Sequence, residues 1–378
     1  MELTEYSGPF RPDARLDDFS KQTIGRVLVA WNRLNLVLDR WWQDLAIAQG
    51  VDLREAHAKI WNSWSKKRPR TIREAVGIDG QDLVSFLKCL QLDSALCYQV
   101  YDLEWELQPA RAAILRVDAP VALPPLADLS HADTDYVAGW LDPCSLQRMA
   151  RVFHERIEVR ERQTSSHYRE FEFLLDDDGP AGLLPVDRGP AAELADYGGP
   201  FRPNLRYEDF SKDRLMKLAV VYAGLGLDLD GLWQMTFRGA TDDKTGVLAE
   251  VKLWGQGSDY WQTQTIDALG IRGNNVTAAM KAMQMDPQHL LFRLDMEMID
   301  DTRGVWTNRH CHAVEFSEAT DDLYMQMHMC KLDWTAYRNA GRHFNVNIEA
   351  FPHELPPRCG SDVCCKWEFR LLPETQIS

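Results

Sequence analysis

The sequence predicts an α+β protein that consists of a tandem duplication of one domain. The first observation is an internal repeat with a period of about 190 residues, which is too long for a solenoid unit. The second is a change of hydrophobic period within each repeat, from 3.6 residues to 2. We therefore expect two domains, each with N-terminal helices and a small antiparallel sheet, that together form a pseudo-dimer.

The repeat is visible along the whole chain. The motif Tyr-x-Gly-Pro-Phe-Arg-Pro occurs at residues 6–12 and again at 197–203. Three further pairs of segments match in order: Gly77-Ile78 with Gly270-Ile271, Asp102-Leu-Glu104 with Asp295-Met-Glu297, and Phe171-Glu-Phe173 with Trp367-Glu-Phe369. We assign residues 1–175 to the N-terminal repeat and 197–378 to the C-terminal repeat. Residues 176–196, rich in acid, Gly and Pro, are expected to be a linker.

Each repeat opens with an irregular segment, because its prolines cannot lie inside a helix. A helix follows, for which Ser211 is the expected N-cap in the second repeat. A Trp-rich helical region comes next. Shorter helices are then predicted over residues 82–92 and 275–285.

Alternating side chains predict the sheet of the C-terminal repeat. We expect strands over residues 292–299, 305–316 and 322–330, the last from the alternation of Met325, Met327 and Met329. A helix over 332–343 and a final strand over 365–372 complete the predicted domain. The predicted order is therefore helices, an antiparallel meander, a helix and a last strand.

Composition limits the function classes. The chain has 378 residues and a formal net charge of −15, which disfavours binding to a nucleic acid polyanion. No stretch approaches the roughly 18 apolar residues of a membrane span. The N-terminus is acidic where a signal peptide would be basic. We expect a cytoplasmic protein with no nucleic acid or membrane partner.

Cysteines are unevenly distributed between the repeats. Five of the eight follow residue 310, and in a reducing compartment they should remain thiols. Where the second repeat has Cys364 and Cys365, the first has Tyr168 and Arg169. We therefore expect the N-terminal repeat to be a degenerate scaffold and the C-terminal repeat to hold one Cys/His site.

Two chemical interpretations of this site remain open. As a zinc or iron site, it would use His310 and His312 from one predicted strand with Cys330 and Cys364. As a nucleophilic site, it would use Cys330 or Cys365 as the thiolate, with His312 or His328 as the base. The plain alternative is a set of buried thiols that pack as small apolar groups, together with surface histidines.

A substrate pocket is also predicted beside these residues. Met327, Trp306 and Trp334 are suited to an adaptable apolar pocket, although a methionine stripe is equally typical of ordinary core. Glu297 shares a predicted strand face with Asp295 and is a candidate acid or base. Its counterpart Glu104 persists in the cysteine-poor repeat, which favours a structural role.

Three motifs carry a family resemblance: the Gly-Pro-Phe-Arg-Pro opening with its Asp-Phe-Ser-Lys end, Asp230–Trp233, and Cys364–Phe369. They resemble a group of bacterial proteins related to L-2-amino-thiazoline-4-carboxylic acid hydrolase, and more remotely to small-molecule-binding domains of the 4-vinyl reductase type. The resemblance implies hydrolysis of a C–N or related bond in a heterocycle or carboxylic acid. Members of the group carry several cysteines in the strand region, and the resemblance implies that Cys311, Cys330, Cys364 and Cys365 correspond to them. The duplication departs from the family and favours a single site.

The function expected from the sequence is an enzyme acting on a small heterocyclic or aromatic molecule. The main alternative is a non-catalytic module that binds a small apolar ligand. A structural or partner-binding subunit is the third possibility, and the scaffold-like first repeat favours it.

Overall fold

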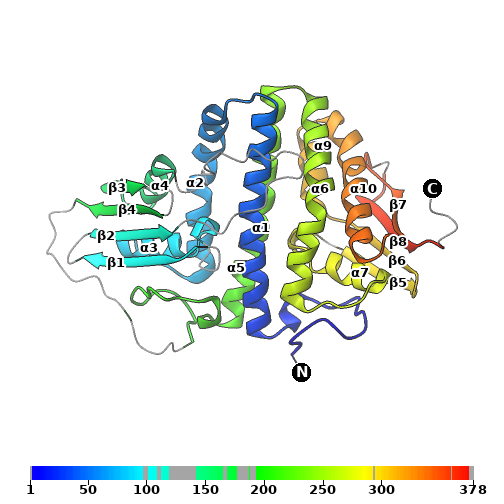
Figure 1. Cartoon of the computed structure of the whole chain (residues 1–378), viewed down its shortest axis with the longest axis horizontal. Helices are drawn as coiled ribbons and strands as arrows, with labels where there is room; N and C mark the ends of the chain where they lie inside the picture. The colour runs from blue at the N-terminus through cyan, green and yellow to red at the C-terminus, as the bar shows by residue number, and fades with distance from the viewer. Residues whose placement is uncertain are drawn as a thin grey trace. The chain divides into compact units, whose positions relative to one another are not determined.

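The computed structural model describes residues 2–96, 101–108, 112–118, 142–164, 168–176, 187, 193–292, 294–358 and 360–373. Over these residues the protein is α+β with two four-stranded antiparallel sheets, which confirms the predicted fold class (Figure 1). Most of the predicted linker, and Cys97 and Cys359, lie outside the described residues.

The same order of strands recurs in both repeats. The first repeat contains α1 (Lys21–Ala48), α2 (Leu53–Val76), α3 (Leu83–Gln91), β1 (Leu103–Gln108), β2 (Ala112–Asp118), α4 (Pro143–Ala150), β3 (Ile157–Thr164) and β4 (Tyr168–Leu175). The second contains α5 (Lys212–Ala240), α6 (Asp243–Leu269), α7 (Val276–Gln284), α8 (Pro287–Leu291), β5 (Leu294–Asp300), β6 (Arg303–Asn308), α9 (His312–Ala319), α10 (Leu323–Phe344), β7 (Ile348–Glu354) and β8 (Cys365–Leu371). The sheets are ordered β1-β2-β4-β3 and β5-β6-β8-β7.

The chain packs into two compact units. Unit 1 contains the residues up to Ala30 and those from Trp233 onward, and unit 2 contains the described residues between Trp31 and Leu232. Each unit therefore combines the opening segment of one repeat with the sheet of the other repeat.

In unit 1 the opening segment is fixed by one buried lysine and its neighbours. The Tyr6 amide donates to the Leu269 carbonyl at 2.7 Å, and the Tyr6 hydroxyl donates to Gln284 at 2.8 Å. Lys281 is 2% exposed. Its ammonium donates to the carbonyl of Tyr6 at 3.1 Å and to that of Gly8. These bonds satisfy carbonyls that a proline-containing segment cannot pair within a helix or strand.

Unit 2 repeats this arrangement with the other opening segment. The Tyr197 amide donates to Val76 at 2.7 Å, and its hydroxyl donates to Gln91 at 2.9 Å. The Lys88 ammonium donates to the carbonyl of Tyr197 at 2.9 Å and to that of Gly199. The matching opening motifs in the sequence are therefore explained by matching docking contacts.

The helices before the sheets agree with the sequence prediction. α2 and α6 end at Gly77 and Gly270, whose φ angles of 69° and 62° are left-handed and favour glycine. Asp82 and Asn275 cap α3 and α7 through bonds to backbone amides at 2.8 and 3.0 Å. Ser211 directly precedes α5, and its hydroxyl accepts the Arg214 amide at 3.4 Å.

The predicted meander is wrong after β6. The predicted strands over 305–316 and 322–330 are wrong beyond Asn308, because residues 312–319 and 323–344 are helices. The helix predicted over 332–343 is confirmed as the later part of α10. The sheet therefore contains the β5–β6 hairpin and then β7 and β8. The methionine alternation over 322–330 was coincidental. Met325 is buried and Met327 is 41% exposed. Asp322 caps α10 by accepting the Met325 amide at 3.0 Å, a helix-start signal that outweighs a short alternating pattern.

The strand β7 was not predicted. It lies at the edge of the sheet beside β8 and contains Pro352, and a proline in a strand is tolerated chiefly at such an edge. The final strand was predicted well, since β8 covers Cys365–Leu371.

The core of unit 1 lies on one face of its sheet. α7 contacts β5, β6 and β8, and α10 packs on β7, as the orange helix beside the red strands shows (Figure 1). Trp306 and Trp367 are adjacent in the β6–β8 register and stack with ring centroids 6.4 Å apart. They are 1% and 0% exposed, so Trp306 is a core residue.

The buried lysine gives a stability prediction. Lys281→Met should lower the free energy of unfolding by about 2–4 kcal/mol, because it leaves the Tyr6 and Gly8 carbonyls without their charged donor. Urea denaturation followed by tryptophan fluorescence measures the change. The control is Lys217→Met, whose exposed pair with Asp213 is worth at most about 1 kcal/mol. Equal effects of the two substitutions would contradict the anchoring role of Lys281.

Candidate functional site

The candidate site is the corner at which β6 ends and α9 begins. Asn308 is the last residue of β6 and is 4% exposed. Its side-chain oxygen accepts the His310 amide at 3.1 Å, and its carbonyl accepts the Cys364 amide at 2.8 Å. These bonds hold the loop before α9 against the start of β8.

Three side chains converge at this corner. His310, His312 and Glu315 place their potential ligand atoms within 4.8 Å of one another. His310 Nδ1 lies 2.5 Å from Glu315 Oε1, and the two imidazole rings are 5.0 Å apart at an angle of 70°. Glu315 follows His312 by three positions on α9, which puts both on the same side of the helix.

The cluster is exposed to solvent on one side and contacts an aromatic ring on another. The His310 side chain is 46% exposed and that of Glu315 is 35% exposed. The ring of Phe292 lies 6.4 Å from that of His312. Cys311, between the two histidines, is only 8% exposed and anchors the loop in the core. The cluster is therefore accessible to a small molecule while its backbone is held in place.

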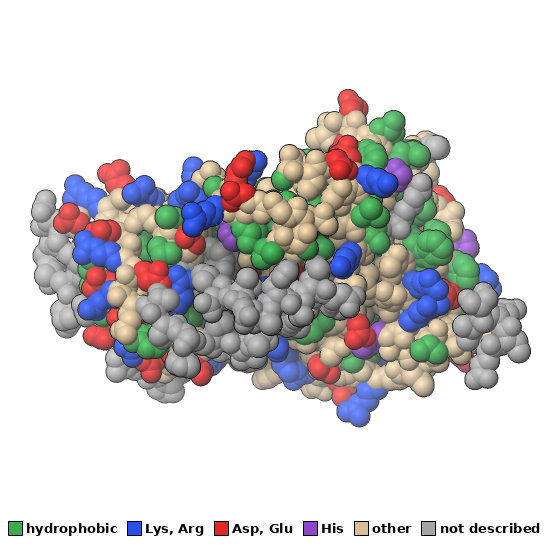
Figure 2. Space-filling view, turned by 45° about the horizontal axis from the view of Figure 1, so that its top comes forward, with side chains coloured by type: hydrophobic (Ala, Val, Ile, Leu, Met, Phe, Trp, Pro, Cys, Tyr) green, Lys and Arg blue, Asp and Glu red, His purple; other side chains and the backbone are tan. Residues whose placement is uncertain are grey.

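Charge near the cluster is locally compensated. Arg309 precedes His310 and pairs with Asp295 at 2.6 Å and with Asp362 at 2.9 Å. The guanidinium is thus bound to two carboxylates beside the histidines. On the face drawn in Figure 2, acidic and basic side chains are likewise interspersed.

The thiols lie beneath this corner. Cys311, Cys330, Cys364 and Cys365 are all buried and belong to the core that contains Trp306 and Trp367. They come from the start of α9, from α10 and from the start of β8, so the structure does bring together the four cysteines singled out in the sequence.

The surroundings of Cys311, Cys330 and Cys364 raise the pKa of each of these three thiols. Burial raises the pKa of Cys311 to about 12. A hydrogen bond with Cys365, together with burial, raises the pKa of Cys330 well above its usual value. Burial also raises the pKa of Cys364, although Arg358, 3.7 Å from its sulfur, opposes this. Because the thiolate is the nucleophile, these values disfavour a nucleophilic role near neutral pH. The assignment of Cys330 or Cys365 as nucleophile stays a prediction.

His328 lies elsewhere. It was placed on a strand face shared with Cys330, but both residues belong to α10, where positions two apart point in different directions. Cys330 is buried, whereas His328 is partly exposed beside Tyr324 at a ring distance of 4.5 Å. Likewise, His310 precedes α9 and His312 begins it, so they do not share a strand.

The predicted pocket residues occupy different surroundings. Trp306 is buried in the core, and Glu297 points to the opposite face of the sheet, because it neighbours Met296, the register partner of Trp306. Met327 is exposed on α10. Trp334 is 49% exposed, and its indole donates to the Ala350 carbonyl at 2.9 Å. These four side chains do not line one common wall.

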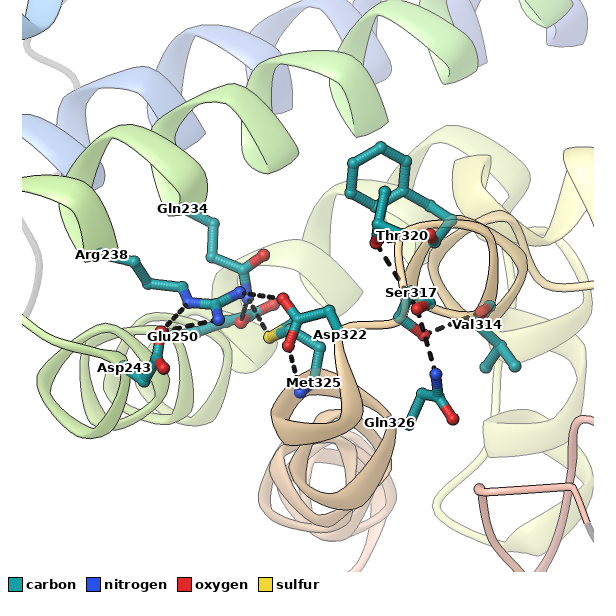
Figure 3. Close-up of polar contacts among 11 residues, drawn as sticks. Gln234, Arg238, Asp243, Glu250, Val314, Ser317, Thr320, Asp322, Met325 and Gln326 are labelled. Carbon is teal, nitrogen blue, oxygen red and sulfur yellow. Dashed lines mark hydrogen bonds and ion pairs between the residues drawn. The ribbon is translucent and has the colours of Figure 1, made fainter.

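The far end of α9 is fixed by a polar network that the sequence did not reveal (Figure 3). Arg238 from α5 bonds Asp243 at 2.7 Å and Asp322 at 2.9 Å. Gln326 of α10 donates to the Ser317 carbonyl of α9 at 3.0 Å. These contacts hold the turn between α9 and α10, and with it the orientation of α9.

Sequence reasoning also missed Glu315. The signal was present, because His310, His312 and Glu315 form a His-x-His-x-x-Glu pattern. Assigning the segment to a strand hid it, since His312 and Glu315 would then face opposite sides.

Comparison with known proteins adds no family. No family model, curated protein or solved structure matches the chain. None of the helices in the described part of the chain is long and apolar enough to cross a membrane.

Thiol reactivity tests the electrostatics of the site. With iodoacetamide at pH 8, Cys330 and Cys364 should react at least about tenfold more slowly than the exposed Cys144, because each unit of raised pKa removes about tenfold of the thiolate. Peptide mapping by mass spectrometry after timed quenching gives the rates. Unfolding in urea should make the rates similar. Labelling of native Cys330 as fast as Cys144 would show that a reactive thiolate exists.

Proposed function

We propose that the chain is an enzyme that hydrolyses a C–N bond in a small organic molecule, with His310, His312 and Glu315 as its reacting groups. The observation that carries the proposal is the convergence of two imidazoles and a carboxylate at an exposed, backbone-fixed corner. The C–N bond comes from the resemblance to L-2-amino-thiazoline-4-carboxylic acid hydrolase, which stays a prediction.

The arrangement suits activation of water. An imidazole held by a carboxylate has a fixed orientation, and a positioned imidazole is the most common general base in enzymes. One imidazole would accept a proton from water as the oxygen attacks the carbon. The C–N bond then breaks and the leaving nitrogen takes a proton, so one water is consumed for each bond cleaved.

The environment of the buried Cys330 thiol favours water over a cysteine as the nucleophile. A hydrolase that used Cys330 or Cys365 as nucleophile would need a thiolate, and the raised pKa of Cys330 opposes its formation. A water nucleophile needs no such group. In this proposal the four cysteines pack beneath the corner and position α9 and β8.

A second candidate is a non-catalytic module for a small apolar ligand. It is favoured by the exposed apolar side chains of α10, namely Leu323, Met327 and Trp334, which are 62%, 41% and 49% exposed. Exposed apolar area of this kind often marks a binding surface. This candidate predicts binding without turnover.

Turnover of a defined panel separates the two candidates. We expect the protein to hydrolyse at least one of L-2-amino-thiazoline-4-carboxylate, a simple lactam and an aryl amide. His310→Ala, His312→Ala and Glu315→Gln should each lower kcat by about 100-fold or more, the usual contribution of a general base. Product release is followed by liquid chromatography with mass detection.

The matched controls are His353→Gln and Glu354→Gln on the exposed end of β7, which should change kcat less than about threefold. Binding of a panel compound without turnover would favour the binding module. Turnover that survives all three site substitutions would contradict the assignment of the site.

A further inference from the structure

We infer that His310, His312 and Glu315 bind a divalent transition-metal ion, with zinc as the ion their chemistry fits best. The inference rests on the proposed function and deepens it by naming the cofactor of the same corner. With the ion bound, the three side chains would hold the metal, and the metal would activate the water in place of a free imidazole. It replaces the ligand set predicted from sequence, which combined His310 and His312 with Cys330 and Cys364.

The first argument is geometric. Ligand atoms that surround zinc at about 2.0–2.2 Å lie roughly 3–3.5 Å from one another. The three ligand atoms here lie within 4.8 Å of one another, so small rotations of exposed side chains suffice to close around an ion. Neither Cys330 nor Cys364 joins such a group among the described residues.

The second argument is orientation. His310 Nδ1 and Glu315 Oε1 lie 2.5 Å apart, so the imidazole and the carboxylate already face each other, and a separation of about 0.5–1 Å would admit an ion at zinc distances. An ion held by this pair would also take the second imidazole, whose ring lies 5.0 Å from the first.

The third argument is the donor set. Two imidazoles and one carboxylate are the protein ligands of catalytic zinc sites that keep a position for water, and the same set also serves non-haem iron. His310 and Glu315 remain accessible to solvent, which leaves room for that water. A bound ion lowers the pKa of its water and supplies hydroxide near neutral pH.

The fourth argument is rigidity. Asn308 fixes the backbone of His310, and the buried Cys311 fixes the residue between the two ligands. The carboxylate extends from the first turn of α9, where the helix dipole favours negative charge. The ligands are therefore positioned by backbone structure and need little ordering on binding.

Cobalt and zinc binding test the inference without any substrate. Chelator-treated protein without a His tag should bind one Co²⁺ per chain with the visible absorption of a four- or five-coordinate site, and Zn²⁺ should displace it. His310→Ala, His312→Ala and Glu315→Gln should each weaken Co²⁺ binding by at least about tenfold. Loss of a residue that only hydrogen-bonds to a metal ligand already lowers metal affinity by about that factor, and loss of a ligand should lower it at least as much. Isothermal titration calorimetry gives the affinities.

Two controls make the result decisive. His353→Gln and Cys364→Ser should leave Co²⁺ affinity within about threefold of the native value. A thiolate charge-transfer band in the native Co²⁺ complex, together with loss of Co²⁺ binding in Cys364→Ser, would overturn the ligand set. His310→Asn and His312→Asn, checked by circular dichroism, guard against unfolding as the cause. Absence of stoichiometric binding to the native chain would also overturn the inference.

The outcome is separable from that of the proposed function. Stoichiometric metal binding by these three residues without turnover supports the inference and contradicts the hydrolase. Turnover by a native chain that binds no Co²⁺ or Zn²⁺ supports the hydrolase and contradicts the inference.

Discussion

The buried ammonium of Lys281, together with its counterpart Lys88, is the interaction on which the rest of the fold depends. Each is 4% exposed or less and donates to two carbonyls of an opening segment that has few internal bonds of its own. A buried charge of this kind is tolerated only when it is hydrogen-bonded or paired. α7, which carries Lys281, contacts three strands of its sheet, so the anchored segment, the helix and the sheet form one packed body.

Matching buried positions of the two repeats can have different partners. Asp93 and Asp286 occupy matching, buried positions after α3 and α7. Asp93 pairs with Arg68 at 3.1 Å, whereas Asp286 accepts the Trp261 indole at 2.6 Å. Each buried carboxylate thus has a donor, which is a guanidinium in the first repeat and an indole in the second.

The proposed site of the second repeat lies in the segment between β6 and β7. There the chain forms α9 and α10, and this segment contributes both histidines, Glu315 and two of the buried cysteines. The anchored frame on which the segment is built is the part that the described residues of the two repeats share.

Most of the helices and strands could be predicted from the sequence, but only part of the candidate site could. The helices α3 and α7 and the strand β8 were found because capping residues and buried aromatic alternation are local signals. The helix over 332–343 was found, but α9 and the first part of α10 were missed, because a methionine alternation over nine residues resembles a strand. The start of α10 is decided by Asp322 and by packing on α6. His310 and His312 were found as residue types, but Glu315 became visible only once α9 was known to be a helix.

Burial, which cannot be read reliably from the sequence, bears on the role of the cysteines. The sequence left Cys330 and Cys365 open as nucleophiles or as buried apolar thiols. Packing in the core with Trp306 and Trp367 raises the pKa of Cys311, Cys330 and Cys364. Side-chain protonation is a tertiary property, because it depends on how much water the fold removes.

X-ray absorption at the zinc edge of the zinc-loaded native chain tests the central claim most directly. The account predicts a first shell of nitrogen and oxygen at about 2.0–2.1 Å with imidazole scattering beyond it, and no sulfur. A sulfur shell at about 2.3 Å would contradict it, because the ion would then be bound by the cysteines and not by His310, His312 and Glu315.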